Sequence, residues 1–68
     1  MTTITIPVSN SENFTPAGLM HRYAKENIGV EFQRTVYGEA KLSMNGVAYK
    51  YDHWKIGDGF VLLYLKEV

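Results

Sequence analysis

The Asn45-Gly46 pair constrains the fold of this chain more than any other short segment. Asn-Gly readily adopts the positive φ angles of a type I′ turn, and apolar residues alternate with polar ones on both sides of it. A two-residue loop fixes the register of the hairpin that it closes. The apolar pairs are then Met44 with Val47, Leu42 with Tyr49, and Ala40 with Tyr51. On the other face Lys41 lies opposite Lys50, and we expect Glu39 and Asp52, which lie diagonally, to give a mixed-charge lattice.

Strand-like alternation continues on both sides of this hairpin. From Val30 onward apolar residues recur at every second position between glycine-containing turns, which predicts a four-stranded antiparallel meander. For the turn at Gly38 we favour a three-residue loop of residues 37–39, because it keeps apolar residues on one face. The pairs are then Phe32 with Met44 and Val36 with Ala40. The last turn has two solutions, residues 57–59 or residues 58–59.

The first third of the chain predicts one strand and one helix. Residues 3–8 alternate with period two, and Pro7 restricts this strand to an edge or its end. Thr15 followed by Pro16 is a typical helix start, so we expect a helix to about Asn27, ended by Gly29. Its apolar stripe comprises Leu19, Met20, Tyr23, Ala24 and Ile28. The polar side comprises His21, Arg22, Lys25 and Glu26.

These elements predict a single α+β domain over residues 1–68. One helix packs on a four- to five-stranded, mainly antiparallel twisted sheet, in the order β-α-β-β-β-β. A chain of 68 residues buries only about 60% of the surface of its unfolded form, so a deep catalytic cleft would compete with the core. We therefore expect a small protein without an enzymatic site.

Composition excludes several function classes. Seven Lys+Arg against seven Asp+Glu give no net charge, which disfavours tight non-specific binding to nucleic acid. There is no cysteine, so neither disulfides nor thiolate metal sites are available. The longest apolar run has six residues, Phe60 to Leu65, against about 20 for a membrane span. No secretory signal pattern is present, and we expect a complete cytoplasmic protein.

The residues suited to catalysis or metal binding are few. The chain has two histidines, His21 and His53, without the spacing of a metal motif. Asp52 and His53 are neighbours on a predicted strand, so their side chains should point to opposite faces and form no dyad. We expect no cofactor, no metal and no small-molecule substrate.

The last hairpin is apolar on both faces. Residues 60–65 are all large and apolar, and Trp54 and Ile56 lie out of phase with Tyr49 and Tyr51 unless a bulge near His53 shifts the phase. One helix covers only one face of a sheet, so the other needs the segment 7–14 with Phe14, a second copy or a partner. We expect a partner-binding surface, because aromatic residues and arginine are enriched at interface hot spots. Its members are Trp54, Ile56, Phe60, Leu62, Tyr64 and Arg34.

Two further features have no settled role, namely Arg34 and the polar side of the helix. Arg34 occupies the apolar phase of its strand, either as an edge residue whose stem covers apolar surface or as an interface anchor. The exposed helix side would suit an acidic partner. Together with strand lysines it gives a secondary candidate surface: His21, Arg22, Lys25, Lys50 and Lys55.

The function that we expect is inhibition or modulation of a larger protein or nucleoprotein complex, with a homodimer as a possible assembly. Chains of this size without cysteine are common among phage and mobile-element accessory proteins, although no residue carries that assignment. The alternative is a small nucleic-acid-binding sheet that uses aromatic and Lys/Arg contacts. Its candidate residues are Tyr49, Lys50, Tyr51, His53, Trp54 and Lys55.

Overall fold

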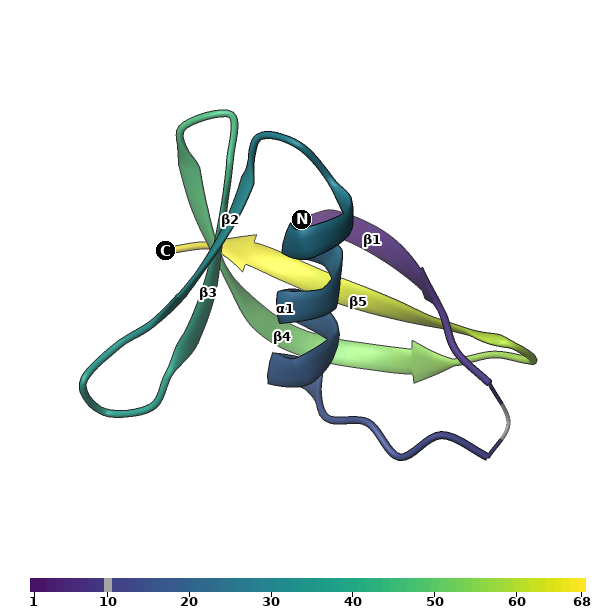
Figure 1. The fold of residues 1–68 in the computed structure, drawn as a ribbon. Helices are drawn as coiled ribbons and strands as arrows, with labels where there is room; N and C mark the ends of the chain where they lie inside the picture. Colours follow the sequence, from purple (N-terminus) through teal and green to yellow (C-terminus); the bar gives the residue numbers. More distant parts are fainter. Residues whose placement is uncertain (10) are drawn as a thin grey trace.

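A computed structural model describes residues 1–9 and 11–68 of the chain. The sheet has five antiparallel strands in the order β1-β5-β4-β3-β2, and one helix connects its two edge strands. The elements are β1 (Thr2–Pro7), α1 (Pro16–Glu26), β2 (Val30–Arg34), β3 (Ala40–Met44), β4 (Val47–Ile56) and β5 (Phe60–Glu67). This is the predicted α+β fold, with the predicted order of elements. Figure 1 shows α1 lying across one face of a strongly twisted sheet, with β2 and β3 running steeply across the direction of β5.

The helix begins and ends for local reasons. The Thr15 hydroxyl accepts a hydrogen bond from the Gly18 amide at 3.1 Å, and Pro16 occupies the first turn, where no donor is lost. At the other end the Asn27 side chain donates to the carbonyl of Tyr23 at 2.8 Å. Helix α1 ends at Glu26, and Ile28 is fully exposed rather than part of the apolar stripe. The backbone at Asn27 is already extended, so the helical spacing that would bring Ile28 inward no longer applies.

The core lies between α1 and the inner face of the sheet, which we define as the face toward the helix. It is built from strand residues at alternate positions and from two helix residues. The buried side chains are Ile4, Ile6, Leu19, Met20, Leu42, Val61, Leu63 and Leu65. Only apolar residues are buried among those described, so the small core holds no polar site.

The Asn45-Gly46 turn has the predicted register. Met44 pairs with Val47 and Leu42 with Tyr49, and both turn residues have positive φ angles, 53° for Asn45 and 79° for Gly46. Lys41 pairs with Lys50, also as predicted.

The turn at Gly38 has three residues, as predicted, but it lies one residue earlier. The Thr35 amide donates to the Glu39 carbonyl at 2.9 Å, so the loop comprises residues 36–38. Phe32 consequently pairs with Leu42 rather than Met44, and Val36 is 94% exposed instead of packing on Ala40. The reason is the φ of +83° at Gly38, because a three-residue hairpin loop places its left-handed residue last.

The last hairpin closes with the two-residue loop of residues 58–59. Ile56 pairs with Val61, and the Gly57 amide donates to the Phe60 carbonyl at 2.8 Å. Gly59 has a φ of +83°, which a glycine adopts without strain. This settles the choice that the sequence pattern left open.

Candidate binding surface

A β-bulge in β4 decides which side chains can meet a partner. The register with β5 shifts between Tyr51 and His53, so that Tyr51 pairs with Leu65 but His53 pairs with Tyr64. The extra residue returns Trp54 and Ile56 to the inner face of the sheet. They had been expected on the opposite face from Tyr51 in the absence of such a bulge.

Trp54 is therefore part of an aromatic cluster beside the core. Its ring lies 5.4 Å from that of Phe14 and 6.3 Å from that of Tyr51, with edge-to-face geometry in both pairs. The segment that carries Phe14 thus covers the inner face at the hairpin. Ile56, at the end of β4, is 58% exposed.

The remaining apolar members of the expected contact set lie on the outer face, which is the sheet face turned away from α1. Phe60, Leu62 and Tyr64 alternate along β5 with the buried Val61, Leu63 and Leu65. The expected set is therefore divided between two faces. No helix or strand in residues 1–9 and 11–68 lies over the outer face.

Neighbouring strands define the surroundings of these three side chains. Leu62 lies between Thr5 of β1 and Lys55 of β4. Tyr64 lies opposite His53, and the two rings stack in parallel at 4.4 Å with an interplanar angle of 4°. Phe60 covers Gly57, where an added Cβ would come within 2.3 Å of the ring. The row thus combines one aliphatic side chain and two aromatic rings that are held by neighbours.

Three lysines continue this face across three strands. Lys41 of β3 pairs with Lys50 of β4, which pairs in turn with Lys66 of β5. Like charges directly opposite one another destabilise a sheet. Asp52 lies 3.2 Å from Lys66, whereas no described carboxylate lies within 4.0 Å of Lys41 or Lys50. The mixed-charge lattice expected from Glu39 and Asp52 is therefore absent from the described residues, and this corner of the outer face is cationic.

The bulge also brings Asp52 and His53 together. His53 Nδ1 lies 2.6 Å from Asp52 Oδ2, although neighbours in a regular strand would point apart. The earlier expectation was wrong because the extra residue in the bulge turns Asp52 and His53 toward the same side. The hydrogen bond from His53, followed by that from Lys66, lowers the pKa of Asp52 below its ordinary value. The three residues form an exposed polar cluster at the end of the lysine row.

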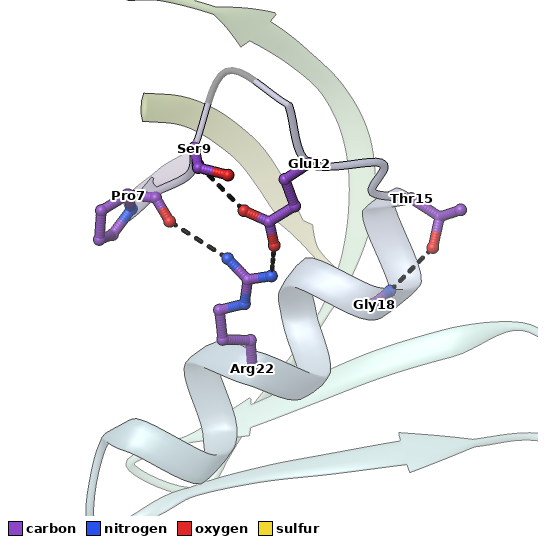
Figure 2. A network of polar contacts seen from close by, with 6 residues as sticks. All are labelled: Pro7, Ser9, Glu12, Thr15, Gly18 and Arg22. Atoms are coloured by element: carbon purple, nitrogen blue, oxygen red, sulfur yellow. Dashed lines mark hydrogen bonds and ion pairs between the residues drawn. The ribbon is translucent and has the colours of Figure 1, made fainter. Parts of the chain in front are cut away.

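The polar side of α1 is partly engaged within the chain (Figure 2). Arg22 forms an ion pair with Glu12, and its other guanidinium nitrogen donates to the carbonyl of Pro7 at 3.2 Å. Glu12 in turn accepts a hydrogen bond from the Ser9 amide at 3.0 Å. The ring of His21 lies 5.0 Å from that of Phe32, and Lys25 is exposed. Through these two contacts Arg22 holds Pro7 and Glu12 against the helix.

The sequence left the role of Arg34 open between an edge position and an interface anchor. Arg34 lies at the end of the edge strand β2, is exposed, and places its guanidinium carbon 6.0 Å from the centre of the Phe32 ring. This agrees with the edge position considered from the sequence, and Arg34 lies far along the sheet order from β5.

The sequence prediction omitted Lys41 and Lys66 from the candidate sites. The signal existed for Lys41, whose register with Lys50 follows from the Asn-Gly turn. Lys66 joins the row only because of the bulge, which shifts its pairing by one residue. Within the described ranges no three histidine, aspartate or glutamate side chains form a metal-binding group, and the helix is too short and polar to span a membrane.

Comparison with known proteins yields no relative. No protein-family model matches the chain, and no curated protein or solved structure matches it significantly. The surface chemistry alone must therefore suggest a function.

Proposed function

We propose that the protein is a non-enzymatic binding module that occupies the surface of a larger protein, alone or within a nucleoprotein complex, and thereby inhibits or modulates it. The observation that carries the proposal is the outer face of the sheet. It presents Phe60, Leu62 and Tyr64 beside a cationic corner, and no described element covers it.

The chemistry of this face favours a protein partner with an apolar centre and acidic rim. Leu62 and the rings of Tyr64 and Phe60 supply apolar contact area. Lys41, Lys50 and Lys66 provide charge that an acidic rim would complement, while relieving their mutual repulsion. Interfaces of this kind combine an apolar centre with a polar, charged rim.

The same lysine row supports a second candidate, binding of single-stranded nucleic acid. Cationic side chains beside aromatic rings are the usual elements of such sites. Tyr64 and His53 stack on each other, however, so each ring has at most one free face for a base. The zero net charge also weakens non-specific attraction to phosphate. We therefore place the protein partner first.

The test is affinity capture from source-cell lysate with wild type and two variants. Leu62→Arg puts a charge in the centre of the outer face, and Ser43→Arg puts the same charge on that face two strands away. We expect a defined protein to be retained by wild type and Ser43→Arg and lost with Leu62→Arg. Circular dichroism must show that both variants are folded.

Two results would contradict the proposal. The partner could remain bound to Leu62→Arg and be lost with Lys25→Glu on α1, which would move the site to the helix. Alternatively, purified wild type could bind a single-stranded oligonucleotide at about 50 mM salt, with affinity that falls steeply with salt and with Lys50→Ala, which would establish the second candidate.

A further inference from the structure

The two edges of the sheet differ in how well they are protected against pairing. Edge strands normally carry proline, bulges or covering segments that prevent association. At the β1 edge Pro7 lacks an amide proton, and Arg22 already donates to its carbonyl at 3.2 Å. Strand β2 contains no proline and pairs with β3 in five consecutive, regular positions. The outward edge of β2 therefore has neither the proline nor the side-chain contact that limits pairing at the end of β1.

The hydrogen-bond pattern identifies the backbone groups on this edge. The Thr35 amide donates to the Glu39 carbonyl at 2.9 Å, so by antiparallel alternation Glu31 and Gln33 also bond toward β3. The amides and carbonyls of Phe32 and Arg34 then point away from the sheet, and no strand among the described residues pairs with them. The Val30 amide is different, because it donates to the Asn27 carbonyl at 3.3 Å.

We propose that β2 pairs with β2 of a second copy of this chain, antiparallel and around a two-fold axis at Phe32, which joins two sheets into one. This register pairs the outward amide and carbonyl of Phe32 with those of the second copy, and it lets the Arg34 amide donate to the Val30 carbonyl of the second copy. It places Glu31 opposite Gln33 of the second copy. A shift by two residues toward the amino terminus would place the two Glu31 carboxylates opposite each other, which is unfavourable.

Exposed apolar residues at both ends of β2 support the same register. Ile28 is 107% exposed and Val36 is 94% exposed, although both are large and apolar. Each lies four residues from Phe32, one on either side. A two-fold axis at Phe32 therefore brings Ile28 of each copy toward Val36 of the other, at both ends of the paired strands. The edge is self-complementary, as an interface around a two-fold axis must be.

Arg34 gains a role in this arrangement. It lies opposite Val30 of the second copy, and its guanidinium carbon is already 6.0 Å from the centre of the Phe32 ring. Because the two-fold axis is perpendicular to the joined sheet, both outer faces lie on the same side. The dimer would present two copies of the outer face in parallel. The pairing itself does not depend on the proposed function.

The first test is the solution mass over a wide range of concentrations, by light scattering after size exclusion. We expect the mass to rise with concentration from 7.7 kDa to twice that value, because five-residue edges give a weak interface. The amides of Phe32 and Arg34 should become protected from hydrogen exchange as the dimer forms. The mass could instead stay at 7.7 kDa up to about 1 mM. Association stronger than about 4 kcal/mol would be visible at that concentration, so this result would overturn the inference.

A charge pair across the interface tests the register. Val36→Glu and Ile28→Lys should each weaken the dimer by roughly tenfold, about 1.4 kcal/mol. The double variant should recover most of that affinity, because the new charges meet across the axis.

Val68→Glu is the matched control, since Val68 is also exposed, at 64%, but lies away from β2. The three positions changed, Ile28, Val36 and Val68, are exposed, so folding should be unaffected. A dimer that resists Val36→Glu and is broken by Leu62→Arg would instead be formed by the outer face and would refute the inference.

Discussion

Replacing Trp54 with alanine separates a role in the fold from a role at an interface. The Trp54 ring packs edge-to-face against Phe14 at 5.4 Å and Tyr51 at 6.3 Å, and it contacts the buried core from the inner face of the sheet. Truncation of a fully buried tryptophan costs about 3 to 5 kcal/mol. Because the side chain of Trp54 is half-buried, we expect a loss of about 2 to 4 kcal/mol in the free energy of unfolding.

That loss is large for so small a domain. At about 0.05 to 0.15 kcal/mol per residue, a chain of 68 residues is stable by about 3 to 10 kcal/mol. With a urea dependence of about 1 kcal/mol per molar, the unfolding midpoint should fall by about 2 to 4 M. The assay is urea denaturation followed by far-ultraviolet circular dichroism, since the variant lacks the only tryptophan.

The control is Tyr64→Ala, which removes an aromatic ring of similar size from the outer face. Tyr64 stacks on His53 but contacts no part of the core, so we expect a loss of about 1 kcal/mol. Near-equal losses for the two variants, or less than about 1 kcal/mol for Trp54→Ala, would refute the assignment of Trp54 to the inner face.

Two further predictions concern the last hairpin and its bulge. Gly57→Ala should lower the free energy of unfolding by about 1 to 3 kcal/mol, because the new methyl group meets the Phe60 ring. In a Phe60→Ala background the loss should be smaller. Equal losses in the two backgrounds, measured by urea denaturation, would show that the ring does not cover Gly57. His53 and Lys66 lower the pKa of Asp52 below 3.8. The stabilisation of the folded state by ionised Asp52 is therefore present above about pH 4 and disappears as the pH falls through the lowered pKa. A carboxyl titration by nuclear magnetic resonance should give a pKa below 3.8 for Asp52 and a value that rises in Lys66→Ala; an unshifted value would rule out the cluster.

The binding surface could be predicted only in part from the sequence. Phe60, Leu62 and Tyr64 share one face in any regular strand, so their grouping follows from a period of two. Whether Trp54 and Ile56 join them depends on the bulge between Tyr51 and His53, which no turn residue in the sequence predicts. The same bulge brought Asp52 and His53 into contact and Lys66 beside Lys50. A one-residue shift reverses the face of every later side chain in the strand, so one local irregularity removed Trp54 and Ile56 from the outer face and added Lys66 to its lysine row.

Local chemistry in the sequence determined the elements of this protein. Thr15 and Pro16 start the helix, Asn45-Gly46 sets one hairpin, and both signals act over four residues or fewer. Only the tertiary structure decided that β1 returns to pair with β5, that β2 is left as an open edge, and that α1 packs on β2, β3 and β4. Those outcomes depend on contacts between residues far apart in the chain, where burial of a common core, rather than any local pattern, selects the arrangement.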